Sequence, residues 1–93
     1  MLKLFFCDDN AQQLALFSDF GKKAILLKEE WDISFGNACS SPELLLRQLP
    51  ASGDTGLYFL DIDFQNGMNG FELAKKIRDV DPRAFLVFIT SHA

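Results

Sequence analysis

Reactive side chains follow three apolar stretches of the sequence. They are two adjacent aspartates near the amino terminus, an Asp-x-Asp pair in the second half of the chain, and a hydroxyl near its end. Crowded carboxylates repel one another, and a divalent cation relieves that repulsion. All-oxygen ligation suits Mg²⁺, and a carboxylate beside Mg²⁺ can also attack phosphorus as a nucleophile. The residues are Asp8 and Asp9, Asp61 and Asp63, and Thr90.

Each of these residues also has a structural interpretation. Asp9 or Asn10 could cap a helix, Asp63 alone is typical of a loop, and Thr90 alone could bond to the backbone at a strand end. Asp61 is harder to explain structurally, because it follows four apolar residues, where an unpartnered charge is unfavourable. The functional interpretation therefore depends on the three positions occurring together.

Strands and helices must alternate to position these groups. Three apolar runs without clean alternation predict strands buried on both faces of a parallel sheet, and a mixed run predicts a more exposed strand. The predicted strands are Leu2–Cys7, Trp31–Ala38, Leu57–Ile62 and Phe85–Thr90.

Three helices are predicted between the strands. Asn10 opens the first, and the third begins near Asn69 or Gly70, with Phe71, Ala74 and Ile77 on its inner face. The second begins at a capping box of Ser40 and Glu43, with Pro42 in its first turn, and runs to about Leu49. The resulting β-α-β-α-β-α-β order predicts an α/β fold with a doubly wound parallel sheet. Ligands bind at the carboxyl ends of the strands in such sheets, where the acids and the hydroxyl fall.

Composition excludes several classes of protein. The chain has 93 residues, 48% of them hydrophobic, and a net charge of −4. These values predict one small folded domain and disfavour a stand-alone nucleic-acid binder, which needs a basic face. No apolar run is long enough for a membrane span, and the amino terminus is unlike a signal peptide. Cys7 and Cys39 lie in apolar stretches and are interpreted as buried thiols of a reduced, cytoplasmic protein.

Several motifs together resemble the receiver domain of bacterial two-component response regulators. The resemblance is strongest to receivers of LytTR-type DNA-binding regulators, which act in quorum sensing. It covers essentially the whole chain and implies a flavodoxin-like sheet with strand order 2-1-3-4-5. The motifs are Phe5–Asp9, Tyr58–Asp63, Asn69–Leu73, Ile77–Arg78 and Phe88–His92.

The resemblance also implies a role for each candidate residue. Asp61 is expected to accept a phosphoryl group from a sensor histidine kinase, and Thr90 is expected to be the switch hydroxyl. Asp8 and Asp9 are expected to bind Mg²⁺ together with Asp61, and Asp63 to offer its backbone carbonyl. Such a domain is a signalling module rather than an enzyme, and it acts on DNA only through a separate effector domain.

The chain departs from the receiver pattern in three respects. The separation between Asp9 and Asp61 is long for the family. The loop after Asp61 lacks the Met-Pro pair that many receivers have. The sequence also stops after the fourth strand, so residues 1–93 are expected to be a receiver that is incomplete at its carboxyl end and has no effector domain. The run Phe85–Thr90 would then be an apolar edge, which predicts self-association.

Two alternatives remain open from the residues alone. Asp61-Ile62-Asp63 with Thr90 also fits a phosphatase of the haloacid-dehalogenase type, in which Asp61 would be the nucleophile. That scheme gives the Asp8-Asp9 pair no role and normally places Asp-x-Asp on the first strand. The other alternative is an interaction module that keeps the fold without phosphorylation, although the retained acids argue against it.

Overall fold

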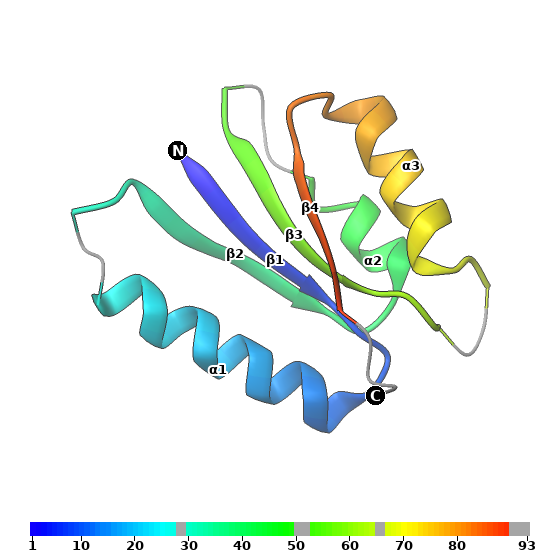
Figure 1. The fold of residues 1–93 in the computed structure, drawn as a ribbon, viewed down its shortest axis with the longest axis horizontal. Coiled ribbons are helices and arrows are strands. Elements are labelled where there is room, and N and C mark those ends of the chain that lie inside the picture. Colours follow the sequence, from blue (N-terminus) through cyan, green and yellow to red (C-terminus); the bar gives the residue numbers. More distant parts are fainter. Residues whose placement is uncertain (28–29, 50–52, 65–66, 90–93) are drawn as a thin grey trace.

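The computed structural model describes residues 1–27, 30–49, 53–64 and 67–89. Four parallel strands form one sheet with helices on both of its faces (Figure 1). The strands are β1 (Leu2–Cys7), β2 (Ile33–Cys39), β3 (Thr55–Asp61) and β4 (Phe85–Ile89), and the helices are α1 (Ala11–Leu27), α2 (Pro42–Leu46) and α3 (Gly70–Val80).

The sheet order is β2-β1-β3-β4, which confirms the predicted doubly wound arrangement. Because β1 is central and all pairings are parallel, the carboxyl ends of β1 and β3 lie side by side, with Cys7 opposite Leu60. This register places the residues that follow β1 next to the last residue of β3. Among the described residues, no helix has the length and apolar character needed to cross a membrane.

The main core lies between the sheet and the α2–α3 layer. Tyr58, Leu60, Leu45, Leu73 and Ile77 are fully buried there. Burial of a large apolar side chain contributes about 1.5–3 kcal/mol, so this layer supplies most of the stabilisation that holds the ends of the strands in place.

Stacked aromatic rings fill the opposite face of the sheet. The Phe6 ring stacks with Phe17 of α1 at 6.1 Å, with Phe35 of β2 at 6.3 Å and with Phe59 of β3 at 5.1 Å between ring centroids. Helix α1 contacts β1 and β2, and an apolar groove of about 410 Å³ runs beside it over Leu57, Phe59 and neighbouring residues.

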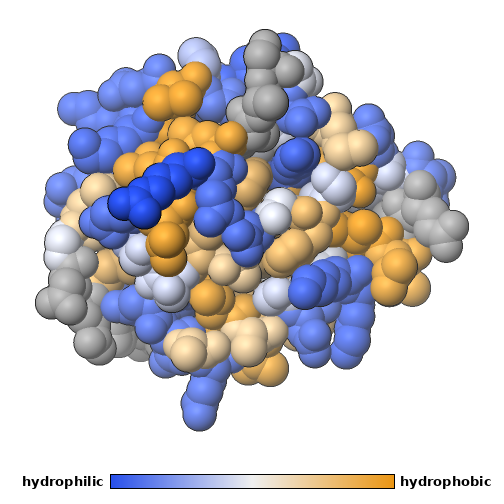
Figure 2. Space-filling view, turned by 180° about the vertical axis from the view of Figure 1, so that it is seen from behind, coloured by the Kyte–Doolittle hydropathy of each residue, from blue (hydrophilic) through white to orange (hydrophobic). Residues whose placement is uncertain are grey.

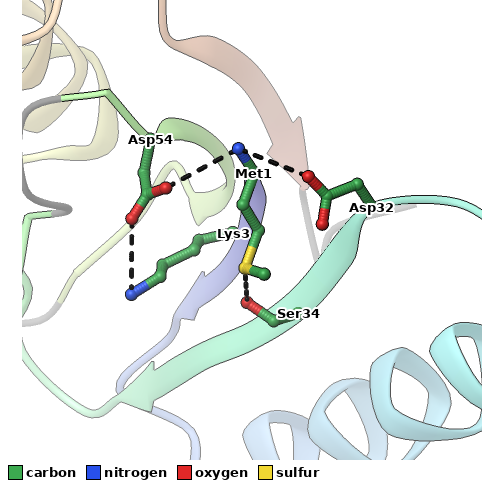
Figure 3. A network of polar contacts seen from close by, with 5 residues as sticks. All are labelled: Met1, Lys3, Asp32, Ser34 and Asp54. Carbon is green, nitrogen blue, oxygen red and sulfur yellow. Dashed lines mark hydrogen bonds and ion pairs between the residues drawn. The ribbon is translucent and has the colours of Figure 1, made fainter.

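Ion pairs hold the amino-terminal edge of the sheet, far along the strands from the acidic residues. The α-amino group of Met1 lies 3.6 Å from a carboxylate oxygen of Asp32 and 3.6 Å from one of Asp54, and Lys3 lies 3.7 Å from Asp54 (Figure 3). The Ser34 hydroxyl donates a hydrogen bond to the sulfur of Met1. These contacts join β1 to the segments that lead into β2 and β3.

The structure corrects the predicted second helix. The N-cap is Ser41, whose hydroxyl accepts a hydrogen bond from the Leu44 N–H at 3.3 Å, and Pro42 occupies the first helical position. The capping box predicted for Ser40 and Glu43 is therefore wrong. The helix ends at Leu46, one turn earlier than predicted, with Arg47 as its C-cap.

Two predictions of burial are also wrong. The inner face of α3 consists of Leu73, Ala74 and Ile77, while Phe71 is 56% exposed and packs against Phe88 with ring centroids 4.8 Å apart. Strand β4 was expected to be buried on both faces, but it has no buried residue. Among the described strands it pairs with β3 alone, and Phe85, Val87 and Phe88 are exposed.

Candidate metal and phosphoacceptor site

Three carboxylates meet at the carboxyl edge of the sheet. Asp8 and Asp9 follow β1, Asp61 ends β3, and one ligand oxygen from each lies within 4.8 Å of the others. Asp8 is 4% exposed and Asp61 is 6% exposed, whereas Asp9 is exposed. The structure thus brings together three of the four acids that the sequence singled out.

Local backbone contacts fix the Asp8 carboxylate. The Asp8 N–H donates to the carbonyl of Cys39 at 3.1 Å, which ties the end of β1 to the end of β2. Its carboxylate oxygen accepts a hydrogen bond from the Asn10 N–H at 2.9 Å. The Asn10 side chain caps α1 by accepting from the Gln13 N–H at 3.0 Å. Of the two candidate caps, Asn10 therefore performs this role.

Close packing at the start of α3 positions Asp61. The Gly70 N–H donates to the Ile62 carbonyl at 2.8 Å, and a Cβ at Gly70 would lie 2.2 Å from the carbonyl oxygen of Asp61. Asn69 caps the helix by accepting from the Glu72 N–H at 2.9 Å. Only glycine allows α3 to begin this close to the strand that carries Asp61.

Burial raises the pKa of the Asp61 carboxyl above its ordinary value of 3.8, and the charges of Asp8 and Asp9 raise it further. Backbone N–H groups of Asp63 and Ile62 oppose part of this shift. Burial likewise raises the pKa of Asp8, which the Asn10 N–H counteracts. The cluster is therefore electrostatically unfavourable when it is fully ionised without a counter-charge.

This donor set fits Mg²⁺. The ligands are carboxylate oxygens, two of them nearly buried, and their mutual repulsion favours a bound divalent cation. When bound, Mg²⁺ would neutralise the charge on a phosphoryl group that approaches Asp61.

Replacing Asp8 by Asn should stabilise the cation-free protein at neutral pH by roughly 1 kcal/mol, because like charges a few ångströms apart repel by up to about 4 kcal/mol near a protein surface. A carboxyl with a raised folded-state pKa favours folding below its unfolded value, and this contribution is lost as the pH rises through the folded value. The gain should therefore shrink as the pH is lowered toward 4. Urea unfolding of Asp8→Asn between pH 7 and pH 4 measures this gain in stability, with Asp19→Asn at an exposed site as the control. Equal gains for both variants would contradict repulsion within the acidic cluster.

The carboxylate cluster does not include the side chains of the other predicted site residues that the structure describes. Thr90, the predicted switch hydroxyl, lies outside the described residues, as do Ser91 and His92. Asp63 is exposed, and the predicted use of its backbone carbonyl as a ligand stays a prediction. Both cysteines are buried and free, as expected, and burial raises the pKa of Cys7 to about 12, so its thiol stays protonated.

The sequence interpretation missed one acidic residue beside the cluster. Glu43 lines a cavity together with Asp9 at the carboxyl edge of the sheet. Its position just after the end of β2 was a usable signal, because β2 neighbours β1 and their carboxyl ends meet at one edge.

The fold is that of response-regulator receiver domains. The RcsB response regulator of Salmonella typhimurium superimposes with a TM-score of 0.64 over 97% of this chain and 41% of that chain, at 16% sequence identity. A second structure of the same regulator gives the same TM-score at 17% identity. No family model matches the sequence.

The chain is homologous over its whole length to Accessory gene regulator protein A. It is 35% identical over 92 residues to the protein from Staphylococcus epidermidis and 33% identical over 92 residues to that from Staphylococcus aureus. The alignment covers 99% of this chain and 38% of each relative, so the chain spans well under half of their length.

Proposed function

We propose that the chain is the phosphoacceptor module of a two-component response regulator, in which Asp61 takes a phosphoryl group from a histidine kinase. The observation that carries this proposal is the convergence of Asp8, Asp9 and Asp61 within 4.8 Å at one edge of a receiver fold. The Asp61 carboxylate oxygen would attack phosphorus, the bond from phosphorus to the donor histidine nitrogen would break, and that nitrogen would take a proton from solvent and leave as the neutral imidazole.

The remaining residues have supporting roles in this proposal. Asp8 and Asp9 hold Mg²⁺ with Asp61, the Asp63 carbonyl completes the ligand set, and Thr90 supplies the hydroxyl that responds to phosphorylation. Homology to Accessory gene regulator protein A supports a cytoplasmic regulator of transcription in quorum sensing. DNA binding would reside in an effector domain outside residues 1–93.

Phosphoryl uptake tests the proposed function. The intact gene product should gain one acid-labile phosphoryl group when it is incubated with acetyl phosphate and Mg²⁺. It should gain none when EDTA replaces Mg²⁺. Intact-protein mass spectrometry measures the gain. Uptake that is unaffected by removal of divalent cations would contradict the role given to the acidic cluster.

Turnover separates this proposal from the haloacid-dehalogenase alternative. A receiver is modified once per molecule and is therefore not an enzyme toward an external substrate, whereas a phosphatase would release many equivalents of p-nitrophenol from p-nitrophenyl phosphate. Asp-x-Asp follows the third strand of this sheet and the Asp8-Asp9 pair joins the cluster, both of which favour the receiver.

We also propose that residues 1–93 self-associate through β4. Phe85 is 59% exposed, and Val87 and Phe88 are each 39% exposed, on a strand that lies at the edge of the described sheet. Figure 2 shows apolar side chains reaching the surface at several places between hydrophilic neighbours. Apolar edge strands of this kind pair with other chains.

Light scattering tests this association. Residues 1–93 should measure at least twice the 10.5 kDa of a single chain. Val87→Lys should shift the protein toward the monomer, because a lysine on an edge strand opposes pairing. A folded wild-type monomer at high concentration would contradict the proposal.

A further inference from the structure

A cavity of about 270 Å³ opens next to the acidic cluster. It is lined by Asp9, by Ser40 before α2 and Glu43 in the first turn of α2, and by Phe64 and Gly67 from the segment that follows β3. The cavity therefore joins the carboxyl ends of β1, β2 and β3. Any species held by Asp9 on this side of the cluster faces Glu43 across the cavity.

The start of α2 fixes Glu43 at this cavity. Ser41 caps the helix, and the ring of Pro42 at the next position restricts the backbone. Leu45, two residues after Glu43, is fully buried in the core and anchors the helix against the sheet. The backbone of Glu43 is thus held from both sides.

The Glu43 carboxylate is directed toward the loops of the site. Its Oε1 atom lies 3.7 Å from the position that a Cβ on Gly67 would occupy. Its charge also contributes to the raised pKa of Cys7, as do the charges of Asp8 and Asp61. Glu43 is therefore part of the same local electrostatic environment as the acidic cluster.

Nothing in the described part of the chain engages this carboxylate. Glu43 makes no hydrogen bond or ion pair with the described residues, and Ser41 rather than Glu43 caps the helix. An acceptor that no described residue engages, at the wall of this cavity, is available to bind water or a hydrated ion.

Mg²⁺ usually keeps several water molecules when only a few carboxylates bind it. Residues that accept hydrogen bonds from such a hydration shell orient the ion, and their loss typically lowers metal affinity 10- to 100-fold. We propose that Glu43 is a positioning residue for the divalent cation of the acidic cluster and accepts hydrogen bonds from its hydration shell across the cavity. This inference rests on the proposed function, because it requires Asp9 to hold the cation.

Paired substitutions of glutamate by glutamine test this role. Glu43→Gln and Glu72→Gln remove the same charge from the first turn of a helix, but only Glu43 lines the cavity. The Mg²⁺ dissociation constant of the cation-free protein, measured by calorimetric titration, should rise about 10-fold in Glu43→Gln. It should change by less than about 2-fold in Glu72→Gln, because Glu72 is likewise exposed but is not among the residues that line the cavity.

Two further measurements separate positioning from folding. The unfolding midpoint without divalent cations should be the same in Glu43→Gln as in the wild type. Glu43→Asp, which keeps the charge on a shorter side chain, should bind Mg²⁺ with an affinity between those of the wild type and Glu43→Gln. Equal Mg²⁺ affinities for Glu43→Gln and Glu72→Gln would overturn the positioning role of Glu43 but not the metal site itself. No Mg²⁺ binding by the wild type would overturn the metal site and with it the inference.

Discussion

Replacing Asp61 by Asn is expected to abolish phosphoryl uptake. The amide oxygen is a poor nucleophile and cannot form the acyl phosphate, while the side chain keeps nearly the same size. Asp61 is 6% exposed at the end of β3, beside the two carboxylates that would hold Mg²⁺ with it. Labelling from acetyl phosphate should fall to background in the protein as its gene encodes it.

Asp54→Asn is the matched control for this prediction. Asp54 lies just before the opposite end of the same strand, where it pairs with the Met1 α-amino group and Lys3 (Figure 3). These pairs are partly exposed and lie away from the acidic cluster, so this variant should label like the wild type. Normal labelling of Asp61→Asn, with the fold intact by circular dichroism, would contradict the assignment of Asp61.

Gly70→Ala should cause the largest loss of stability among single-methyl additions near the site. The new Cβ would lie 2.2 Å from the Asp61 carbonyl oxygen and 2.8 Å from the Ile62 Cα. Both atoms belong to the backbone and cannot rotate away, so α3 must shift away from β3. Overpacking of this severity costs about 3 kcal/mol or more, measurable as a lower urea midpoint.

Gly21→Ala provides the comparison for this effect. Its Cβ would meet side-chain carbons of Phe6 at 2.8 Å and Leu4 at 3.0 Å, which can move by small rotations. The change also improves helix propensity within α1 by up to about 1 kcal/mol. Gly21→Ala should therefore cost clearly less than Gly70→Ala, and the reverse order would contradict the close packing described for α3.

The sheet and the acidic cluster could be predicted from the sequence because they depend on patterns. Apolar runs of strand length alternate with helical segments, and this order favours a parallel sheet whose carboxyl ends share one edge. Asp8 and Asp61 then lie together whatever the details of packing. Strand β2 was also predicted, but from Trp31 to Ala38. It runs from Ile33 to Cys39, because residues 30 and 31 lie in a turn and bend.

Features that depend on neighbouring elements could not be predicted in the same way. Ser40 and Ser41 are equally good caps by type, and only the final position of α2 selects Ser41 and leaves Glu43 facing the cavity. The apolar composition of β4 alone predicts burial on both faces, and only its expected position at the edge of the sheet pointed to the exposure that the structure shows.

Identification of the phosphorylated residue tests the central claim most directly. After incubation with acetyl phosphate and Mg²⁺, reduction with borohydride converts an aspartyl phosphate to homoserine, and peptide mass spectrometry locates the change. The account predicts homoserine at position 61 and at no other aspartate of residues 1–93. An unmodified Asp61 in a folded protein that carries its phosphoryl group elsewhere, or takes up none, would contradict it.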